Sequence, residues 1–374
     1  MEIKCKQREL AAVVAQAERF ADPKNPREVA SKILLEAKAS GLTLSATDLY
    51  LGIRATCPCE TVKEGAVVVS ARDLLERVTH MPSEREIAIS LDRAKVVLRS
   101  VGGTRRYSLM TVAAGDFPSL PSPSGNPEGV VTSLVLRRLF DKTVFAVTAD
   151  GRQIPQANLK IEFNGTAIRG VALDGHRLVK IDLVDEASSM GTLDLLLPLR
   201  GVRELMRILP DDDTLLTLSS NGRHLFVDTG NCRVHVLLAE GMFPAYEHAI
   251  HEDNPRVATV PRLELLDAIK AVSVSASILD GAVSLEFSLG TVKVRAESQI
   301  GDEADDEIPA KYDGEDCATR ACAKYFLDSL STTDTEEVVF RLGEPKDGIF
   351  LAPGGESRDA HVIMPMYREG VPNA

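Results

Sequence analysis

Bulky apolar residues recur at helical spacing in six separate stretches of the chain, and each stretch begins with a basic residue. The first stretch continues with Leu10, Val13 and Val14, and the last with Phe326 and Leu330. The basic residues are Arg8, Arg72, Arg137, Arg200, Arg262 and Lys324, so subtraction gives steps of 64, 65, 63, 62 and 62 residues. A constant period along a whole chain indicates one supersecondary unit that is repeated. The sequence therefore predicts six units with one helix each.

Each interval between these helices also carries two runs of alternating apolar and polar residues, joined by turn residues. Alternation with a period of two around Gly, Asp-Gly or Gly-Gly is typical of a β-hairpin, because a tight turn needs a positive φ. The predicted hairpins span residues 42–55, 96–111, 168–181, 225–238, 284–297 and 349–365. One unit is then a helix with three or four antiparallel strands.

A unit of this length buries too little apolar surface to be stable alone, so we expect pairs of units to share a core. Three pairs also agree with the usual size of domains in a chain of 374 residues. Polar and Pro-rich breaks lie at 118–129 and 251–255. The predicted fold is α+β, with three similar domains at residues 1–124, 125–253 and 254–374, each made of two β-α-β-β-β-type repeats.

Composition indicates an ordinary globular protein, with 44% apolar and 26% charged residues. No run of 18 apolar residues occurs, and the opening Met-Glu-Ile-Lys is unlike a signal peptide, so we expect a cytoplasmic protein. Its six cysteines are then expected to be reduced. They lack the paired Cys-x-x-Cys spacing of a structural zinc site, and we expect no metal and no cofactor.

The charge is unevenly distributed, although 43 basic against 55 acidic residues give a net charge of −12. Residues 93–106 carry five basic residues and no acid, whereas residues 302–316 carry eight acids and only Lys311. Such runs are usually solvated faces. Complementary patches far apart in one chain also suit a head-to-tail contact that closes into a ring.

The motifs expected of common enzymes are absent or incomplete. The chain has no Gly-x-x-x-x-Gly-Lys phosphate loop and no Gly-x-Ser-x-Gly elbow. Asp174 and His176 could orient and supply a general base, but Asp-Gly in a hairpin is typical of a plain turn. His248 and His251, followed by Glu252, have the wrong spacing for a metalloprotease, and surface residues are the simpler interpretation.

Several short motifs, in this order, resemble the bacterial DNA sliding clamp, the beta subunit of DNA polymerase III. They are Ser-Ala-Thr-Asp-Leu at 45–49, Ala-Gly-Asp-Phe-Pro at 114–118, Leu-Asp-Gly-His-Arg-Leu at 173–178, Gly-Met-Phe-Pro-Ala-Tyr at 241–246 and Val-Ile-Met-Pro-Met at 362–366. The resemblance covers essentially the whole chain. It implies a non-catalytic processivity factor, a head-to-tail homodimeric ring with helices inside and antiparallel sheets outside. It also implies sequence-independent binding of double-stranded DNA, and short linear peptides of the clamp loader, replicative polymerase and repair enzymes as partners.

The resemblance also implies three sets of site residues. The peptide-binding cleft would comprise Gly175, His176, Arg177, Leu178, Pro244, His248, Ala249, Val362, Met364, Pro365 and Met366. The dimer seam would comprise Arg105, Arg106, Tyr107 and Leu109 against Val272 and Val274, flanked by Asp302 and Glu303, with Tyr107 and Leu109 giving most of the affinity. Sliding needs weak phosphate contacts, for which the candidates are Lys24, Arg72, Arg77, Arg137, Arg152, Arg200, Arg203 and Lys324.

Some residues depart from the family pattern. They are Glu28-Val-Ala-Ser31 after the first helix, Gln156, Leu173 before Asp-Gly-His-Arg, and Tyr367-Arg368 with the continuation to Ala374. A diverged clamp paralogue that serves a dedicated partner is therefore a second interpretation. A third is a metal-dependent or nucleophilic enzyme on repeated α+β domains, for which the sequence offers no convergent ligand set or triad.

Overall fold

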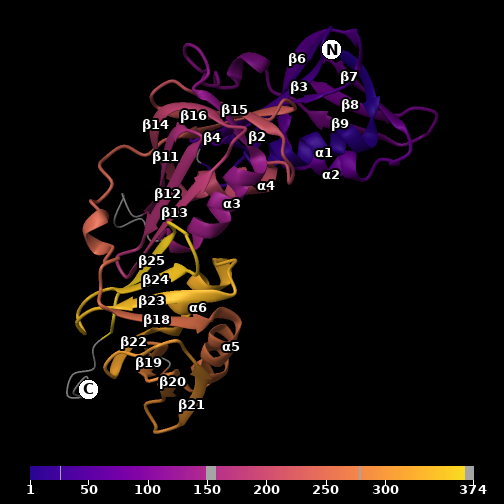
Figure 1. Ribbon diagram of the computed structural model, residues 1–374. Coiled ribbons are helices and arrows are strands. Elements are labelled where there is room, and N and C mark those ends of the chain that lie inside the picture. Colours follow the sequence, from indigo (N-terminus) through magenta and orange to yellow (C-terminus); the bar gives the residue numbers. More distant parts are fainter. Residues whose placement is uncertain (26, 149–156, 278, 367–374) are drawn as a thin grey trace. The chain divides into compact units, whose positions relative to one another are not determined.

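The computed structural model describes residues 1–25, 27–148, 157–277 and 279–366 (Figure 1). The predicted DNA contact Arg152, as well as Gln156, Tyr367 and Arg368, lies outside these residues. By the contacts between residues the chain divides into two compact units. Unit 1 comprises Met1–Leu134, Ala187–Gly191 and Arg200–Leu238, and unit 2 comprises Val135–Glu186, Thr192–Leu199 and Ala239–Ala374.

Six β-α-β-β-β repeats follow one another along the described chain, as the periodicity predicts. The first contains β1 (Glu2–Lys6), α1 (Gln7–Glu18), β2 (Lys32–Lys38), β3 (Gly41–Thr47) and β4 (Leu51–Cys57), with the short β5 (Glu60–Lys63) after it. The second contains β6 (Gly65–Ser70), α2 (Ala71–Thr79), β7 (Glu86–Asp92), β8 (Lys95–Ser100) and β9 (Arg106–Met110). The third contains β10 (Gly129–Thr132), α3 (Ser133–Thr143), β11 (Asn158–Gly165), β12 (Ala167–Leu173) and β13 (Arg177–Val184).

The later repeats keep the same order of elements. The fourth contains β14 (Ser189–Pro198), α4 (Leu199–Ile208), β15 (Leu215–Ser220), β16 (His224–Asp228) and β17 (Cys232–Leu237). The fifth contains β18 (Arg256–Pro261), α5 (Arg262–Val272), β19 (Ala282–Ser288), β20 (Thr291–Glu297) and β21 (Glu303–Pro309). The sixth contains β22 (Cys317–Cys322), α6 (Ala323–Thr332), β23 (Glu337–Leu342), β24 (Ile349–Pro353) and β25 (Ala360–Ile363). All six predicted hairpins are formed.

The strands pair antiparallel in both units. Unit 1 contains a five-stranded sheet in the order β5-β1-β7-β8-β9, and unit 2 a four-stranded sheet in the order β21-β20-β19-β22. Distant repeats also join: β4 pairs with β17 within unit 1, and β13 pairs with β25 within unit 2. These two joints involve strands outside the five- and four-stranded sheets, and their backbone pairing satisfies groups that an open edge would expose.

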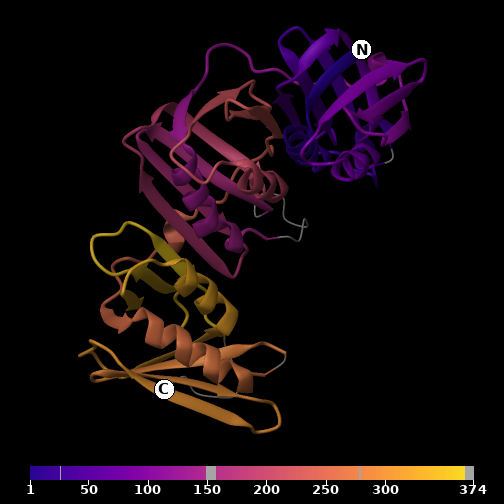
Figure 2. The ribbon, with the colours of Figure 1, turned by 90° about the vertical axis from the view of Figure 1, so that its right-hand side faces the viewer.

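The helices bury the apolar residues that the pattern marks. In Figures 1 and 2, α1 lies beside α2 and α5 beside α6. Leu10, Leu74, Leu265 and Phe326 on these helices have no exposed surface. Burying a side chain of this size stabilises the fold by about 1.5–3 kcal/mol. The core is therefore built between the helices and the inward faces of the strands.

Candidate functional site

An apolar cluster forms where β13 pairs with β25, in the part of unit 2 that holds most of the predicted cleft. Leu178 lies directly opposite Val362 in the ladder. We call this the junction cluster, which comprises Val171, Leu173, Leu178, Tyr246, Phe350, Ala360 and Val362. Leu178 and Val362 are 5% and 2% exposed, whereas Met364 is 42% exposed. Leu178 and Val362 thus form the floor of the region, and Met364 offers the accessible apolar surface.

The segment after β25 runs beside the hairpin of β12 and β13. The backbone N–H of Met364 donates to the backbone carbonyl of His176 at 2.8 Å. The backbone N–H of Met366 donates to the backbone carbonyl of Arg320 at 2.7 Å. A Cβ added to Gly348 would lie 2.6 Å from Val362, 3.8 Å from the Met364 sulfur and 3.9 Å from the Ala249 carbonyl. The structure therefore brings His176, Leu178, Ala249, Val362 and Met364 together, and it adds Gly348. Exposed Pro244 and His248 lie in the connecting segment that Tyr246 anchors to the cluster.

Arg177, one of the predicted cleft residues, is buried, and its guanidinium is held by contacts within unit 2. Its guanidinium donates to Asp174 at 2.9 Å, to Asp328 at 2.5 Å and to the carbonyl of Phe145 at 2.6 Å. It also lies over the ring of Tyr325, with 4.6 Å between Cζ and the ring centroid. Burial, and then the charge of Asp174, raises the pKa of Tyr325. The sequence does not reveal this pairing, because Asp328 lies 151 residues away from Arg177.

Asp174 has the structural role that its turn motif indicates. Its Oδ1 accepts hydrogen bonds from the backbone N–H groups of His176 and Arg177, both at 3.0 Å. Gly175 takes a φ of 87° within this turn. The Asp and His of this motif are thus parts of a hairpin turn and not an aligned acid and base.

The candidate DNA contacts differ in how free their charges are. Lys24, Arg72 and Arg203 are exposed, and Arg137 is half-buried and has contacts of its own. Three others are held by carboxylates of the same chain: Arg77 by Asp73 at 2.9 Å, Arg200 by Asp48 and Lys324 by Asp328. The Asp48 side chain is only 1% exposed, so Arg200 compensates a buried charge. The freest candidates among the described residues are Lys24, Arg72 and Arg203.

Part of the basic run and most of the acidic run lie at sheet edges. All five basic residues of 93–106 are exposed, but Lys95 and Arg99 lie on β8 and only Arg106 lies on β9, the last strand of its sheet. The acidic residues of 303–307 lie on β21, the outer strand of the other sheet. Ser100 N–H donates to the Arg105 carbonyl and Thr111 N–H to Ala94. Since antiparallel pairs alternate between bonded and non-bonded residues, the backbone groups of Arg106, Ser108 and Met110 face away from β8.

The same reasoning applies to β21. Ser298 N–H donates to the Asp302 carbonyl and Ala310 N–H to Gly290, so the backbone groups of Glu303, Asp305 and Glu307 face away from β20. Two side chains of this strand are paired with β20, Glu303 with Arg295 at 2.8 Å and Asp305 with Lys293 at 3.0 Å. Each of these two sheets therefore presents one edge without a strand partner among the described residues, although the N–H of Glu307 donates to Asp306 Oδ1 at 2.9 Å.

Two residues of the predicted seam cannot contribute apolar contact surface. Leu109 is 5% exposed and Val272 is 2% exposed, because both point into the core of their own unit. The strand alternation explains Leu109: Tyr107 and Leu109 face inward, while Arg106, Ser108 and Met110 face out. Val274 is 86% exposed and remains available. Leu109 and Val272 are therefore corrected as apolar contributors to the seam, whereas Tyr107 and Val274 stay predictions.

No metal centre is evident in the part of the chain that the structure describes. No three His, Cys, Asp or Glu side chains gather there in a way that could hold an ion. Cys5 and Cys57 are buried free thiols, and the hydrogen bond between them, together with burial, raises the pKa of Cys5 far above its usual range. Among the described helices, none is long and apolar enough to cross a membrane.

The chain matches three family models in order along its length. They describe the N-terminal domain of the DNA polymerase III beta subunit at residues 1–121, the central domain at 130–245 and the C-terminal domain at 248–367. Only residues 122–129, 246–247 and 368–374 fall outside the matches.

Relatives and solved structures give the same result over nearly full length. The beta sliding clamp of Pseudomonas aeruginosa is 27% identical over 339 residues, which cover 90% of this chain and 92% of the relative. That of Treponema pallidum is 26% identical over 99% of this chain and 100% of the relative. A crystal structure of the Pseudomonas aeruginosa clamp has a TM-score of 0.90 and 26% identity, over 98% of this chain and 100% of that one. The Bacillus subtilis clamp, at 19% identity and a TM-score of 0.93, shows the same fold. The chain therefore belongs to the DNA polymerase III beta subunit family, the non-catalytic sliding clamps of bacterial DNA replication.

Proposed function

We propose that two copies of this sliding clamp join head to tail into a ring around duplex DNA, with β9 of each copy paired to β21 of the other. The observation that carries the proposal is that both strands are sheet edges with outward-facing backbone groups, and that exposed basic residues lie on and beside β9 whereas β21 is acidic. Backbone pairing would satisfy both edges. The basic and acidic side chains would set orientation and on-rate more than affinity. The chain would contribute three domains, at residues 1–124, 125–253 and 254–374.

The interior of the ring would hold DNA through weak and interchangeable phosphate contacts. Lys24, Arg72 and Arg203 are the strongest candidates because no carboxylate neutralises them among the contacts described above. Arg77, Arg137, Arg200 and Lys324 would contribute less, or only when phosphate displaces a carboxylate. Arg152 remains a candidate from the sequence alone. Binding to open linear duplex is expected to be weak and to fall steeply as salt rises.

The partner site is the surface around the junction cluster. A short linear segment of a polymerase, clamp loader or repair enzyme would place one or two apolar anchors against Met364, Pro365 and the floor formed by Leu178 and Val362. Met suits a surface that adapts to several partners. Polar contacts would come from the exposed backbone at Gly175 and His176, with Pro244, His248, Ala249 and Met366 at the rim. Arg177 would support this surface from beneath.

The ring is tested by blocking one edge without touching the core. Ser108→Pro removes a backbone donor that faces away from β8, and proline is tolerated on edge strands. The variant should sediment at 40.5 kDa, whereas the parent and the control Ser108→Ala should sediment at twice that mass. A Ser108→Pro protein that remains folded and fully dimeric would place the seam elsewhere. Substituting Leu109 would not serve, because it would damage the core.

A further inference from the structure

Asp328 on α6 is shared between a residue beneath the partner site and a residue among the DNA candidates. It accepts from Arg177 at 2.5 Å and also pairs with Lys324, one helical turn away on α6. The Arg177 side chain is 7% exposed, that of Asp328 24% and that of Lys324 65%. One carboxylate thus connects a buried cation with an exposed one.

Tyr325 adds a second contact between α6 and the same hairpin. Its ring lies under the guanidinium of Arg177 and stacks with His176, whose ring centroid is 6.3 Å away at an interplanar angle of 15°. The carbonyl of His176 in turn accepts the Met364 N–H. The position of the hairpin, and with it one wall of the partner site, therefore depends on how firmly α6 holds Arg177 and His176.

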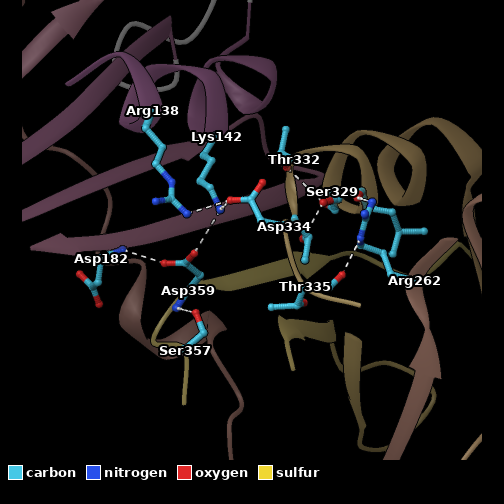
Figure 3. Close-up of polar contacts among 12 residues, drawn as sticks. Arg138, Lys142, Asp182, Arg262, Ser329, Thr332, Asp334, Thr335, Ser357 and Asp359 are labelled. Carbon is cyan, nitrogen blue, oxygen red and sulfur yellow. Dashed lines mark hydrogen bonds and ion pairs between the residues drawn. The ribbon is translucent and has the colours of Figure 1, made fainter. Parts of the chain in front are cut away.

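The far end of α6 is fixed by separate contacts, which Figure 3 shows. Asp334, just beyond the helix, pairs with Lys142 and Arg138 of α3, each at 2.9 Å. Arg262 donates to the carbonyls of Leu330 and Thr335, at 3.1 Å and 2.7 Å. Because this end is anchored, a change in the pairing of Asp328 should act on the hairpin and should not shift the helix.

We propose that Asp328 couples DNA contact to partner binding. A DNA phosphate that binds Lys324 draws the Lys324 ammonium away from Asp328. The Asp328 carboxylate then interacts with Arg177 alone and binds it more strongly. The hairpin becomes better ordered before the partner arrives, so partner peptides bind more tightly to the clamp on DNA than to the free clamp. This inference rests on the proposed function, since it requires both the DNA surface and the partner site.

The coupling should be modest and reciprocal. A partly exposed ion pair typically contributes 1 kcal/mol or less, so we expect DNA to tighten peptide binding about two- to threefold. By linkage, the peptide must tighten DNA binding by the same factor. Tyr325 and Asp328 act as positioning residues, because neither needs to touch the peptide.

The test measures the Kd of the clamp for a fluorescein-labelled peptide, which is copied from the clamp-binding segment of the organism's polymerase. The Kd is measured at low salt, with and without a saturating 30-base-pair duplex. The parent should gain about two- to threefold with duplex. Lys324→Gln should bind the peptide with the tighter affinity already and gain nothing. Asp328→Asn should bind more weakly and also gain nothing. The matched control Lys6→Gln, which removes an exposed lysine from the i,i+3 pair with Glu9, should behave like the parent.

Two results would overturn the coupling while leaving the proposed function intact. One is peptide binding by the parent that duplex does not change. The other is an undiminished duplex effect in Lys324→Gln. Complete failure of the parent to bind the peptide would instead count against the proposed partner site, and with it against the coupling.

Discussion

Leu178 on β13 lies opposite Val362 on β25, so the last strand of the described residues is hydrogen-bonded to the third repeat. This pairing ends at Ile363, and the accessible Met364 follows at once. In the proposed partner site, the floor is therefore part of the fold, while the apolar rim belongs to the segment after β25. The two parts can be separated by mutation.

Truncation before Met364 should abolish peptide binding and leave the dimer intact. The deletion removes the exposed apolar surface and the N–H that donates to His176, but it keeps β25. Peptide affinity is measured by fluorescence anisotropy and mass by sedimentation, with truncation after Met366 as the matched control. If the shorter chain still bound polymerase and clamp-loader peptides with unchanged affinity, the site would lie elsewhere.

Lys142→Met should destabilise unit 2 by about 2–3 kcal/mol, because the Lys142 side chain is only 9% exposed and its amine pairs with Asp334 at 2.9 Å and Asp359 at 3.8 Å. Burial raises the pKa of Asp334, but the hydrogen bonds and charges of Lys142 and Arg138 outweigh it and hold this pKa below its usual value. Urea unfolding followed by circular dichroism measures the loss. Arg138→Met is the control: Arg138 is 56% exposed and meets only Asp334 among its described ion pairs, so the cost should be about 0.5 kcal/mol. Equal costs would refute the buried role of Lys142.

Gly52→Ala should destabilise unit 1 by about 1–3 kcal/mol through overpacking. Gly52 lies opposite His235 between β4 and β17, and an added Cβ would be 2.1 Å from Cε1 of that ring. Replacing His235 by Ala in the same chain should recover part of the loss, which a double-mutant cycle measures. Additive losses would mean that the ring is not the obstacle.

The free energy of unfolding should fall as pH drops from 7 to 5.5. Burial lowers the pKa of His361 to about 3 and that of His235 to about 4, from 6.5. Between these values the unfolded chain binds protons that the native chain does not, so stability is complete above pH 6.5 and is lost below it. Two such groups predict a fall of about 2–3 kcal/mol at pH 5.5. Burial raises the pKa of Asp359, which opposes this trend at lower pH.

Urea titrations at several pH values measure the slope. His361→Met should reduce the slope in unit 2 by about one proton, whereas the slope of unit 1 should keep the contribution of His235. A His361→Met variant with an unchanged pH dependence would show that His361 titrates normally in the folded chain.

Local patterns predicted the repeats but not the pairings between them. The apolar spacing located α1 through α6, and the turn residues located the six predicted hairpins, because both depend on neighbours in sequence. Further hairpins such as β2–β3 and β7–β8 were not predicted. Arg177 and Leu109 show the limit. Whether Arg177 reaches a ligand or Asp328 depends on a contact with a residue more than a hundred positions away in sequence. Whether Leu109 faces the core or a partner depends on the register of its strand. The basic residue at the start of each helix likewise has no common role, since Arg200 pairs with Asp48 and Arg262 with backbone carbonyls.

The central claim is that the closed ring holds DNA by enclosing it. The most direct measurement is retention on DNA: the clamp is loaded by its clamp loader onto nicked circular DNA, passed through a gel-filtration column in high salt, and the DNA is then cut once. The clamp should stay with the circular DNA at a salt concentration that abolishes binding to linear duplex. It should be lost after the DNA is cut, because a ring can slide off a free end without breaking any protein–DNA contact. A clamp that leaves intact circles as fast as cut ones, or that stays on linear DNA in high salt, would contradict the claim.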